Sequence, residues 1–339
     1  MRVISAIYLL AVLSLSAVVG GNAHAADSLK VRLDWTPWGV QAPFHLAAKK
    51  QLFAKHGLDV ALEDGNGSVA TVQIVGNGTY DVGHASLATM AIARSKGLPI
   101  RAIANFIRQN DIGLMVGTDL GVDGPRDLKG KKLAFTAGSL ETPFLDRFLA
   151  KGGLKRADVE LTNVDAANKG GLYIAGRVDG AFSSAPFMQP LLELQRPTKT
   201  IRFSDYDFAL PSFGLFATES AIASKGPALK KFASIIAASW TYIFDGHEDE
   251  AVQAIIDARP QAKLNPVVLR RQIETLKELR DTPSTQGKTV GLMTDTDWEK
   301  SIETLKQAEL IDHANPPGFF YTNDLIDERL VQEVVRELK

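Results

Sequence analysis

Two tryptophans and an aspartate at the end of the first expected strand carry the clearest binding chemistry in the sequence. Trp35 and Trp38 follow a strand expected over residues 29–34, in a loop that also contains Pro37. An indole in such a loop is a stacking platform for a flat ring, and the Asp34 carboxylate would accept charge-assisted hydrogen bonds from a ring amine or amidine. The alternatives are an ordinary core tryptophan and an aspartate that only stabilises the turn.

A second group of polar residues lies where a short strand, expected over residues 81–83, leads into a helix over residues 87–96. Free backbone N–H groups at a helix start bind the polar edge of a ligand. Ser86 is a natural ligand contact there, although helix capping alone accounts for it. His84 is a further candidate contact, and a buried structural histidine is the alternative.

The arrangement at residues 81–86 occurs again at residues 179–184. Both segments begin with aspartate, both follow a helix that ends in glycine, and both end in a small-residue turn before another helix. Ser183 and Ser184 are therefore candidate contacts at the corresponding place. Two copies indicate a pair of similar lobes, not a solenoid.

Strand and helix patterns alternate from residue 29 to residue 216, which predicts an α/β fold with largely parallel sheets. Ligands bind at the carboxyl ends of strands in open α/β sheets, so two facing lobes would form a cleft. The expected strands cover residues 29–34, 58–62, 81–83, 100–107, 113–116, 131–135, 159–164, 178–182, 200–203 and 212–217. Helices alone are expected afterwards, over residues 227–245, 247–258, 265–280, 294–308 and 326–338.

Composition removes several classes of function. The 339 residues carry a net charge of -1, so there is no basic footprint for a nucleic-acid partner. The cysteine count is zero, which excludes disulfides, thiolate metal sites, cysteine nucleophiles and a lipoprotein anchor. The His-Glu-Asp-Glu run at residues 247–250 looks like a metal site, but it begins a helix, where acids are favoured. We therefore predict no metal site, no cofactor and no catalytic residue.

Residues 1–25 have the pattern of a secretory signal peptide. Arg2 precedes a short apolar run, and Ala23 and Ala25 fit a signal-peptidase site. The alternative is an uncleaved anchor helix, although the apolar run is short for a membrane span. We expect a periplasmic protein that is exported through this cleavable segment.

Five motifs in collinear order resemble one protein family. They are the Asp-Trp-Thr-Pro segment with the helix after it (residues 33–60), then residues 72–83, 91–100, 127–134 and 176–180. Together they resemble the periplasmic substrate-binding proteins of ABC importers for thiamine-pyrimidine precursors and, more distantly, for sulfonates, taurine and nitrate. The resemblance spans about residues 29–220, and Gln51 stands where the family usually has glycine.

The resemblance implies a two-lobed type II periplasmic binding protein fold with two crossover strands and a helical C-terminal tail. The first crossover is expected near residues 116–118 and the return near residues 212–218, with the tail helices on the first lobe. The expected organisation is a signal peptide at 1–25, the first lobe at 26–116 and 213–339, and the second lobe at 117–212.

The resemblance also implies further site residues. The family binds its ligand with the turn that follows the first strand of the second lobe, which here contains Gly138, Ser139, Glu141 and Thr142. A helix cap with a first-turn acid is the other interpretation of this turn. The family often places an aromatic residue near the return crossover, where Phe213 lies, and its pattern favours Trp35 over Trp38 as the stacking ring.

The implied function is a monomeric receptor that captures a small heteroaromatic molecule, such as a thiamine pyrimidine precursor, by lobe closure. Its partners would be a membrane permease and an ATPase, and no chemical step is expected. A same-fold receptor for a sulfonate, taurine or nitrate is the first alternative, which Asp34 and Glu141 disfavour. A fungal branch of the family synthesises the pyrimidine, but zero cysteines and the signal peptide disfavour that activity. A sensory role is the third alternative.

Overall fold

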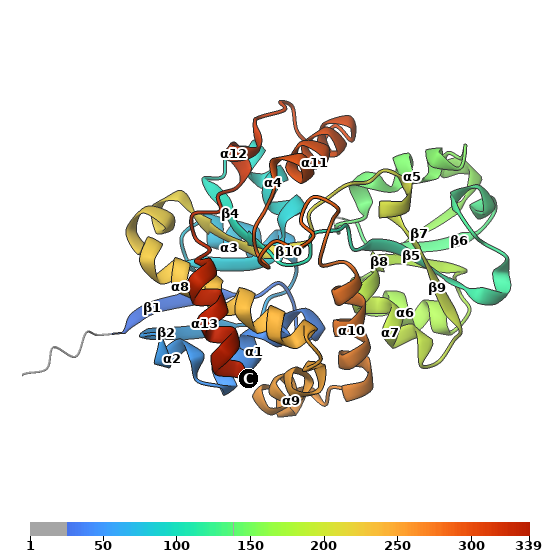
Figure 1. The fold of residues 1–339 in the computed structure, drawn as a ribbon. Coiled ribbons are helices and arrows are strands. Elements are labelled where there is room, and N and C mark those ends of the chain that lie inside the picture. Colours follow the sequence, from blue (N-terminus) through green and yellow to red (C-terminus); the bar gives the residue numbers. More distant parts are fainter. Residues whose placement is uncertain (1–25, 138) are drawn as a thin grey trace, which may run out of the picture.

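The computed structural model describes residues 26–137 and 139–339 and shows two lobes joined by two chain crossings (Figure 1). Each lobe is built on a five-stranded sheet, in the order β2-β1-β3-β10-β4 in the first lobe and β7-β6-β8-β5-β9 in the second. The ten expected strands are all present: β1 (Asp27–Arg32), β2 (Leu58–Glu63), β3 (Val82–Ser86), β4 (Ile100–Asn105), β5 (Ile112–Gly117), β6 (Lys132–Phe135), β7 (Glu160–Asn163), β8 (Gly180–Ser184), β9 (Thr198–Arg202) and β10 (Phe213–Thr218).

The two sheets share one topology. In the first, β1 pairs in parallel with β2 and β3, and β10 pairs antiparallel with β3 and β4. In the second, β6 pairs in parallel with β7 and β8, and β5 pairs antiparallel with β8 and β9. The antiparallel strand of each sheet follows, along the chain, an edge strand of the other lobe: β5 comes after β4, and β10 comes after β9. This confirms the predicted α/β architecture with two crossover strands and a helical tail.

The predicted first boundary, at residue 116, needs correction. β5 lies wholly in the second sheet, so the chain crosses between the lobes at residues 106–111. All six residues of β5 are buried, and a uniformly apolar strand gives no sign of which sheet it joins. The return crossing precedes β10, which begins at Phe213.

Helices cover both faces of the sheets. Those of the first lobe are α1 (Ala42–Lys49), α2 (Leu52–Lys55), α3 (Ser68–Gly76) and α4 (Leu87–Ser95), and those of the second are α5 (Leu145–Lys151), α6 (Ala166–Ile174) and α7 (Ala185–Glu193). The tail adds α8 (Glu219–Phe244), α9 (Glu248–Ala258), α10 (Pro266–Glu278), α11 (Asp295–Gln307), α12 (Pro317–Phe320) and α13 (Glu328–Leu338). No helix of the described residues combines the length and the apolar character needed to span a membrane.

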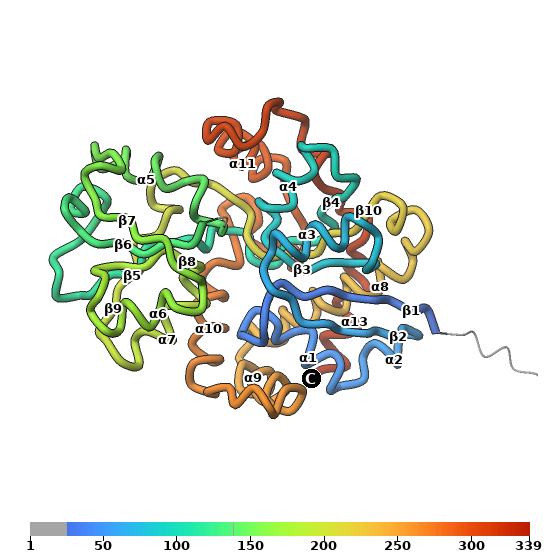
Figure 2. The backbone as a smooth tube through the Cα atoms, turned by 180° about the vertical axis from the view of Figure 1, so that it is seen from behind, coloured from blue at the N-terminus to red at the C-terminus, as the bar shows by residue number. Residues whose placement is uncertain are grey.

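Most of the tail packs on the first lobe, as the resemblance implies. α8 and α13 lie side by side, and α1 packs against α8 and α9 (Figure 2). Helix α10 is different, because it contacts both α9 in the first lobe and α7 in the second. The tail therefore also joins the lobes.

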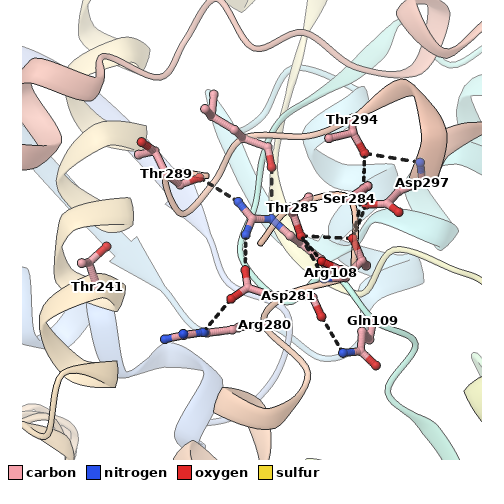
Figure 3. Close-up of polar contacts among 12 residues, drawn as sticks. Arg108, Gln109, Thr241, Arg280, Asp281, Ser284, Thr285, Thr289, Thr294 and Asp297 are labelled. Atoms are coloured by element: carbon pink, nitrogen blue, oxygen red, sulfur yellow. Dashed lines mark hydrogen bonds and ion pairs between the residues drawn. The ribbon is translucent and has the colours of Figure 1, made fainter. Parts of the chain in front are cut away.

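The first crossing is fastened to the tail through Arg108, whose guanidinium is buried. It donates hydrogen bonds to the Asp281 carboxylate at 2.6 Å, the Thr289 carbonyl at 2.7 Å and the Leu292 carbonyl at 3.1 Å (Figure 3). The backbone N–H groups of Arg108 and Gln109 both donate to the Leu279 carbonyl. The crossing is thereby held against the loop between α10 and α11.

Candidate functional site

A cleft of about 470 Å³ lies between the lobes and brings most of the predicted site residues together. The first lobe contributes the loop after β1, the start of α3 and the first residue of β10, namely Asp34, Trp35, Trp38, residues 66–70 and Phe213. The second lobe contributes the turn after β6, the start of α6 and the junction of β8 with α7, namely Thr136, Ala137, Ser139, Leu140, Glu141, Ala166, Ala167, Lys169, Ser183, Ser184, Phe187 and Met188.

Aromatic rings from both lobes form the wall of the cleft. The Trp38 indole meets the Phe187 ring edge-on, with centroids 5.5 Å apart, and the Phe213 ring at 5.3 Å. Trp38 is buried, whereas Trp35 is partly exposed. A ring that keeps one accessible face can stack on a ligand, so Trp35 is the better candidate.

Hydrogen bonds fix the loop that contains the two tryptophans. The Asp34 carboxylate accepts from Trp38 Nε1 at 3.0 Å and from Gln41 Nε2 at 3.3 Å. The Gly67 N–H donates to the Asp34 carbonyl at 2.7 Å. Gly67 has a φ of 126°, which L side chains rarely adopt. His84 Nδ1 also lies 3.4 Å from Asp34 Oδ1. Asp34 thus has the turn-stabilising role and also faces the cleft, where Oδ2 can accept a second hydrogen bond.

A buried ion pair forms the polar part of the opposite wall. Lys169 Nζ lies 2.7 Å from Glu141 Oε1 and donates to the Phe182 carbonyl at 2.6 Å. Both side chains are 3% exposed. Glu141 is therefore already paired within the protein. Sequence reasoning missed Lys169, although Lys169 and Tyr173 are four residues apart on one buried face of α6, a position where lysine is rare unless it has a partner.

The hydroxyl groups of the turn after β6 point toward its own backbone. Ser139 Oγ and Thr142 Oγ1 both donate to the Thr136 carbonyl at 2.7 Å. Ser139 lines the cleft, but Thr142 is not among the lining residues. Gly138 lies outside the described residues. The contact proposed for Thr142 thus gives way to a structural role in the turn.

His84 and Ser86 do not line the aromatic cleft. Strand β3 continues through both residues, so His84 points into the core, where its ring stacks on Phe213 at 5.7 Å and meets Phe44 at 4.9 Å. The Ser86 hydroxyl caps α4 by accepting from Thr89 N. Ser86 lines a separate hollow of about 270 Å³. The structure thus gives both residues a packing or capping role outside the cleft lining, although His84 Nδ1 lies 3.4 Å from Asp34 Oδ1 behind it.

Ser183 and Ser184 end β8 and line the cleft as predicted from the repeat. Beneath them the first crossing places the buried Asp111, whose carbonyl accepts from Ala185 N at 2.8 Å. Its carboxyl accepts a hydrogen bond from Ser212 Oγ at 2.6 Å, which links the two crossings. Burial raises the pKa of Asp111, so the crossings meet around a carboxyl group that holds its proton more tightly than usual.

The arrangement suits binding of a flat, electron-poor ring that carries N–H donors. Among the described lining residues, the charged side chains are Asp34, Glu141 and Lys169, and the lysine is neutralised by its partner. Asp34 has no lysine or arginine partner among the described residues, and its nearest basic neighbour is the His84 ring, whose Nδ1 lies 3.4 Å from Asp34 Oδ1. Sequence reasoning also missed the ring of Phe187, which follows Ser184 by one helix turn at the start of α7.

Comparison with known proteins gives the same fold and related binding proteins. The chain is 23% identical to the formylaminopyrimidine-binding protein of Halalkalibacterium halodurans over 88% of its length and 91% of that protein. It is 24% identical to a 4-amino-5-hydroxymethyl-2-methylpyrimidine phosphate synthase of Saccharomyces cerevisiae, but over only 50% of its length and 49% of the enzyme.

Among solved structures, the alkanesulfonate-binding protein SsuA of Xanthomonas axonopodis pv. citri, bound to MOPS, matches with a TM-score of 0.66 at 16% identity. The match covers 89% of this chain and 99% of that one. The fold is thus that of the periplasmic binding proteins. The NMT1/THI5-like family matches residues 38–251, more than half of the chain, and the protein belongs to that family.

Proposed function

We propose that this protein is the periplasmic receptor of an ABC importer and that its ligand is a pyrimidine precursor of thiamine. The observation that carries the proposal is the aromatic cleft between the lobes, in which Asp34 is the acidic side chain that has no lysine or arginine partner among the described residues. Cleavage after Ala25 and delivery to a permease with its ATPase are part of the proposal, although residues 1–25 lie outside the described part of the chain.

The electrostatics of the cleft favour a pyrimidine over an anion. A sulfonate or nitrate requires donors that are free to meet its charge. Lys169 already donates to Glu141 and to the Phe182 carbonyl, so an anion would compete with Glu141 for it. An aminopyrimidine instead presents N–H donors to Asp34 and a flat face to the tryptophans.

Calorimetry on the mature chain tests the proposal, with formylaminopyrimidine, methanesulfonate and nitrate as separate ligands. We expect binding of the pyrimidine alone. Trp35→Ala should weaken that binding by up to about a hundredfold, because stacking on an aromatic side chain contributes about 1–3 kcal/mol per ring.

The melting temperature should change little in Trp35→Ala, because the ring is only partly buried. Trp38→Ala is the matched control, since loss of this fully packed indole should destabilise the fold by about 3–5 kcal/mol. Tight binding of methanesulfonate or nitrate without the pyrimidine would overturn the assignment in favour of an anion receptor.

A further inference from the structure

Gln272 on α10 bridges the two lobes behind the aromatic wall. The residue is 2% exposed. Its Oε1 accepts a hydrogen bond from the Gly39 N–H of the first lobe at 2.9 Å. Its Nε2 donates to the Phe187 carbonyl, in α7 of the second lobe, at 2.9 Å. One buried amide group therefore uses its acceptor on one lobe and its donor on the other.

Both backbone groups bound by this amide belong to the aromatic wall. Gly39 directly follows Trp38, and the Phe187 ring is the one that meets the Trp38 indole at 5.5 Å and 80°. The two hydrogen bonds and the ring contact thus connect Trp38, Gly39, Gln272 and Phe187 in a closed ring of contacts. A shift of α7 away from the first lobe would separate the two rings, and it would have to break one of the two hydrogen bonds of the Gln272 side chain.

The glycine at position 39 leaves room for this bridge. A Cβ atom at Gly39 would lie 2.7 Å from Cβ of Gln272 and 3.2 Å from the Ile273 nitrogen. Glycine therefore permits the approach of α10 to the loop after Trp38. The helix also reaches the second lobe through Arg202 and Glu278, at 2.7 Å, but exposed ion pairs of this kind contribute little.

We propose that Gln272 is a positioning residue that holds Phe187 against Trp38 and so presets the width of the cleft. The predicted effect on ligand affinity rests on the proposed function, whereas the Gln272 bridge can be tested without any ligand. Where the bridge is broken, the Phe187 ring can move away from the Trp38 indole, and the aromatic wall comes apart. Apparent affinity then falls in proportion to the fraction of molecules that keep the wall assembled.

Two substitutions separate the halves of the bridge. Gln272→Met removes both hydrogen bonds, so the Gly39 amide should exchange with solvent at least about tenfold faster, and affinity for formylaminopyrimidine should fall about tenfold. Gln272→Glu, measured at pH 8, retains an acceptor for the Gly39 N–H but has no donor for Phe187. In Gln272→Glu, the Gly39 amide should stay protected from exchange while the affinity for formylaminopyrimidine falls. A general loss of stability would not separate these two effects.

Small-angle scattering gives a third readout without ligand, because both variants should show a larger radius of gyration than the unmodified chain. Gln253→Met is the matched control, since this exposed glutamine on α9 donates a hydrogen bond to Asp257 on its own helix and bridges no lobes. Unchanged Gly39 exchange, radius and affinity in Gln272→Met would overturn the inference. If no variant and not even the unmodified chain binds the pyrimidine, the proposed function fails, while exchange and scattering still decide the role of Gln272.

Discussion

His45 is a buried titratable residue of α1 that lies outside the cleft. Burial, aided by the positive charge of Arg259, lowers its pKa to about 4. The folded state therefore holds this imidazole neutral between about pH 4 and pH 6.5, whereas the unfolded chain protonates it. Because the unfolded state binds the extra proton there, stability must fall as the pH is lowered through this window.

We expect this residue to cost about 3 kcal/mol of folding stability between pH 7 and pH 4, at about 1.4 kcal/mol per pKa unit. His45→Gln should flatten the dependence, because glutamine does not titrate. Urea denaturation at several pH values measures the slope, and His313→Gln at the exposed His313 serves as the control. An unchanged slope in His45→Gln would assign the acid sensitivity to other groups.

At the residue scale, sequence reasoning succeeded where one strand end decides the position. Asp34, Trp35 and Ser183 each lie at the carboxyl end of a strand, and all three line the cleft. It failed for Lys169, whose partner Glu141 is 28 positions away, because no local pattern encodes that pairing. It also misplaced His84, since the strand expected to end at residue 83 continues to Ser86.

At the scale of the elements, the attachment of the first crossing to the tail depends on the Arg108 side chain. Arg108→Met should destabilise the fold by about 3 kcal/mol, because it leaves one charged and two backbone acceptors without their donor. Arg108→Lys should recover little, since an ammonium cannot reproduce the fork of the guanidinium.

The matched control is Arg280→Met, because Arg280 bonds to the same Asp281 carboxylate from a more exposed position. It should change stability by less than about 1 kcal/mol. Chemical denaturation measures all three variants. Equal effects of the two Met variants would mean that Asp281 alone, and not the buried fork, fastens the crossing.

The elements themselves were largely predictable, because period-two and helical patterns are local. All ten strands and four of the five long tail helices lie near their expected bounds, whereas α8 begins at Glu219, eight residues before its expected start. The partners of the elements were harder to predict. β5 follows β4 of the first sheet but pairs with β8 and β9 of the second, and α10 contacts both α9 and α7. Such partners are set by packing between segments far apart in sequence. The boundary at residue 116 was wrong for this reason.

For the whole molecule, we expect the lobes to approach each other when the cleft is filled. A ligand that touches Trp35 on one lobe and the β6 turn on the other binds the closed form better and shifts the population toward it. Small-angle scattering should show a smaller radius of gyration with saturating formylaminopyrimidine. Trp35→Ala at the same ligand concentration should shift less, and an unchanged radius in the unmodified chain would rule out closure.

The exchange of strands between the lobes also orders the assembly of the chain. All five strands of the second sheet come from residues 112–202, whereas the first sheet lacks its fourth strand until residues 213–218 are available. During synthesis from the N-terminus, β3 and β4 must wait with unpaired edges for a strand more than a hundred residues later, a long-range pairing that is intrinsically slow. The chain therefore stays incompletely folded until most of it has been made, a state that suits the export proposed above. The lobe that begins the sequence is the last to be completed.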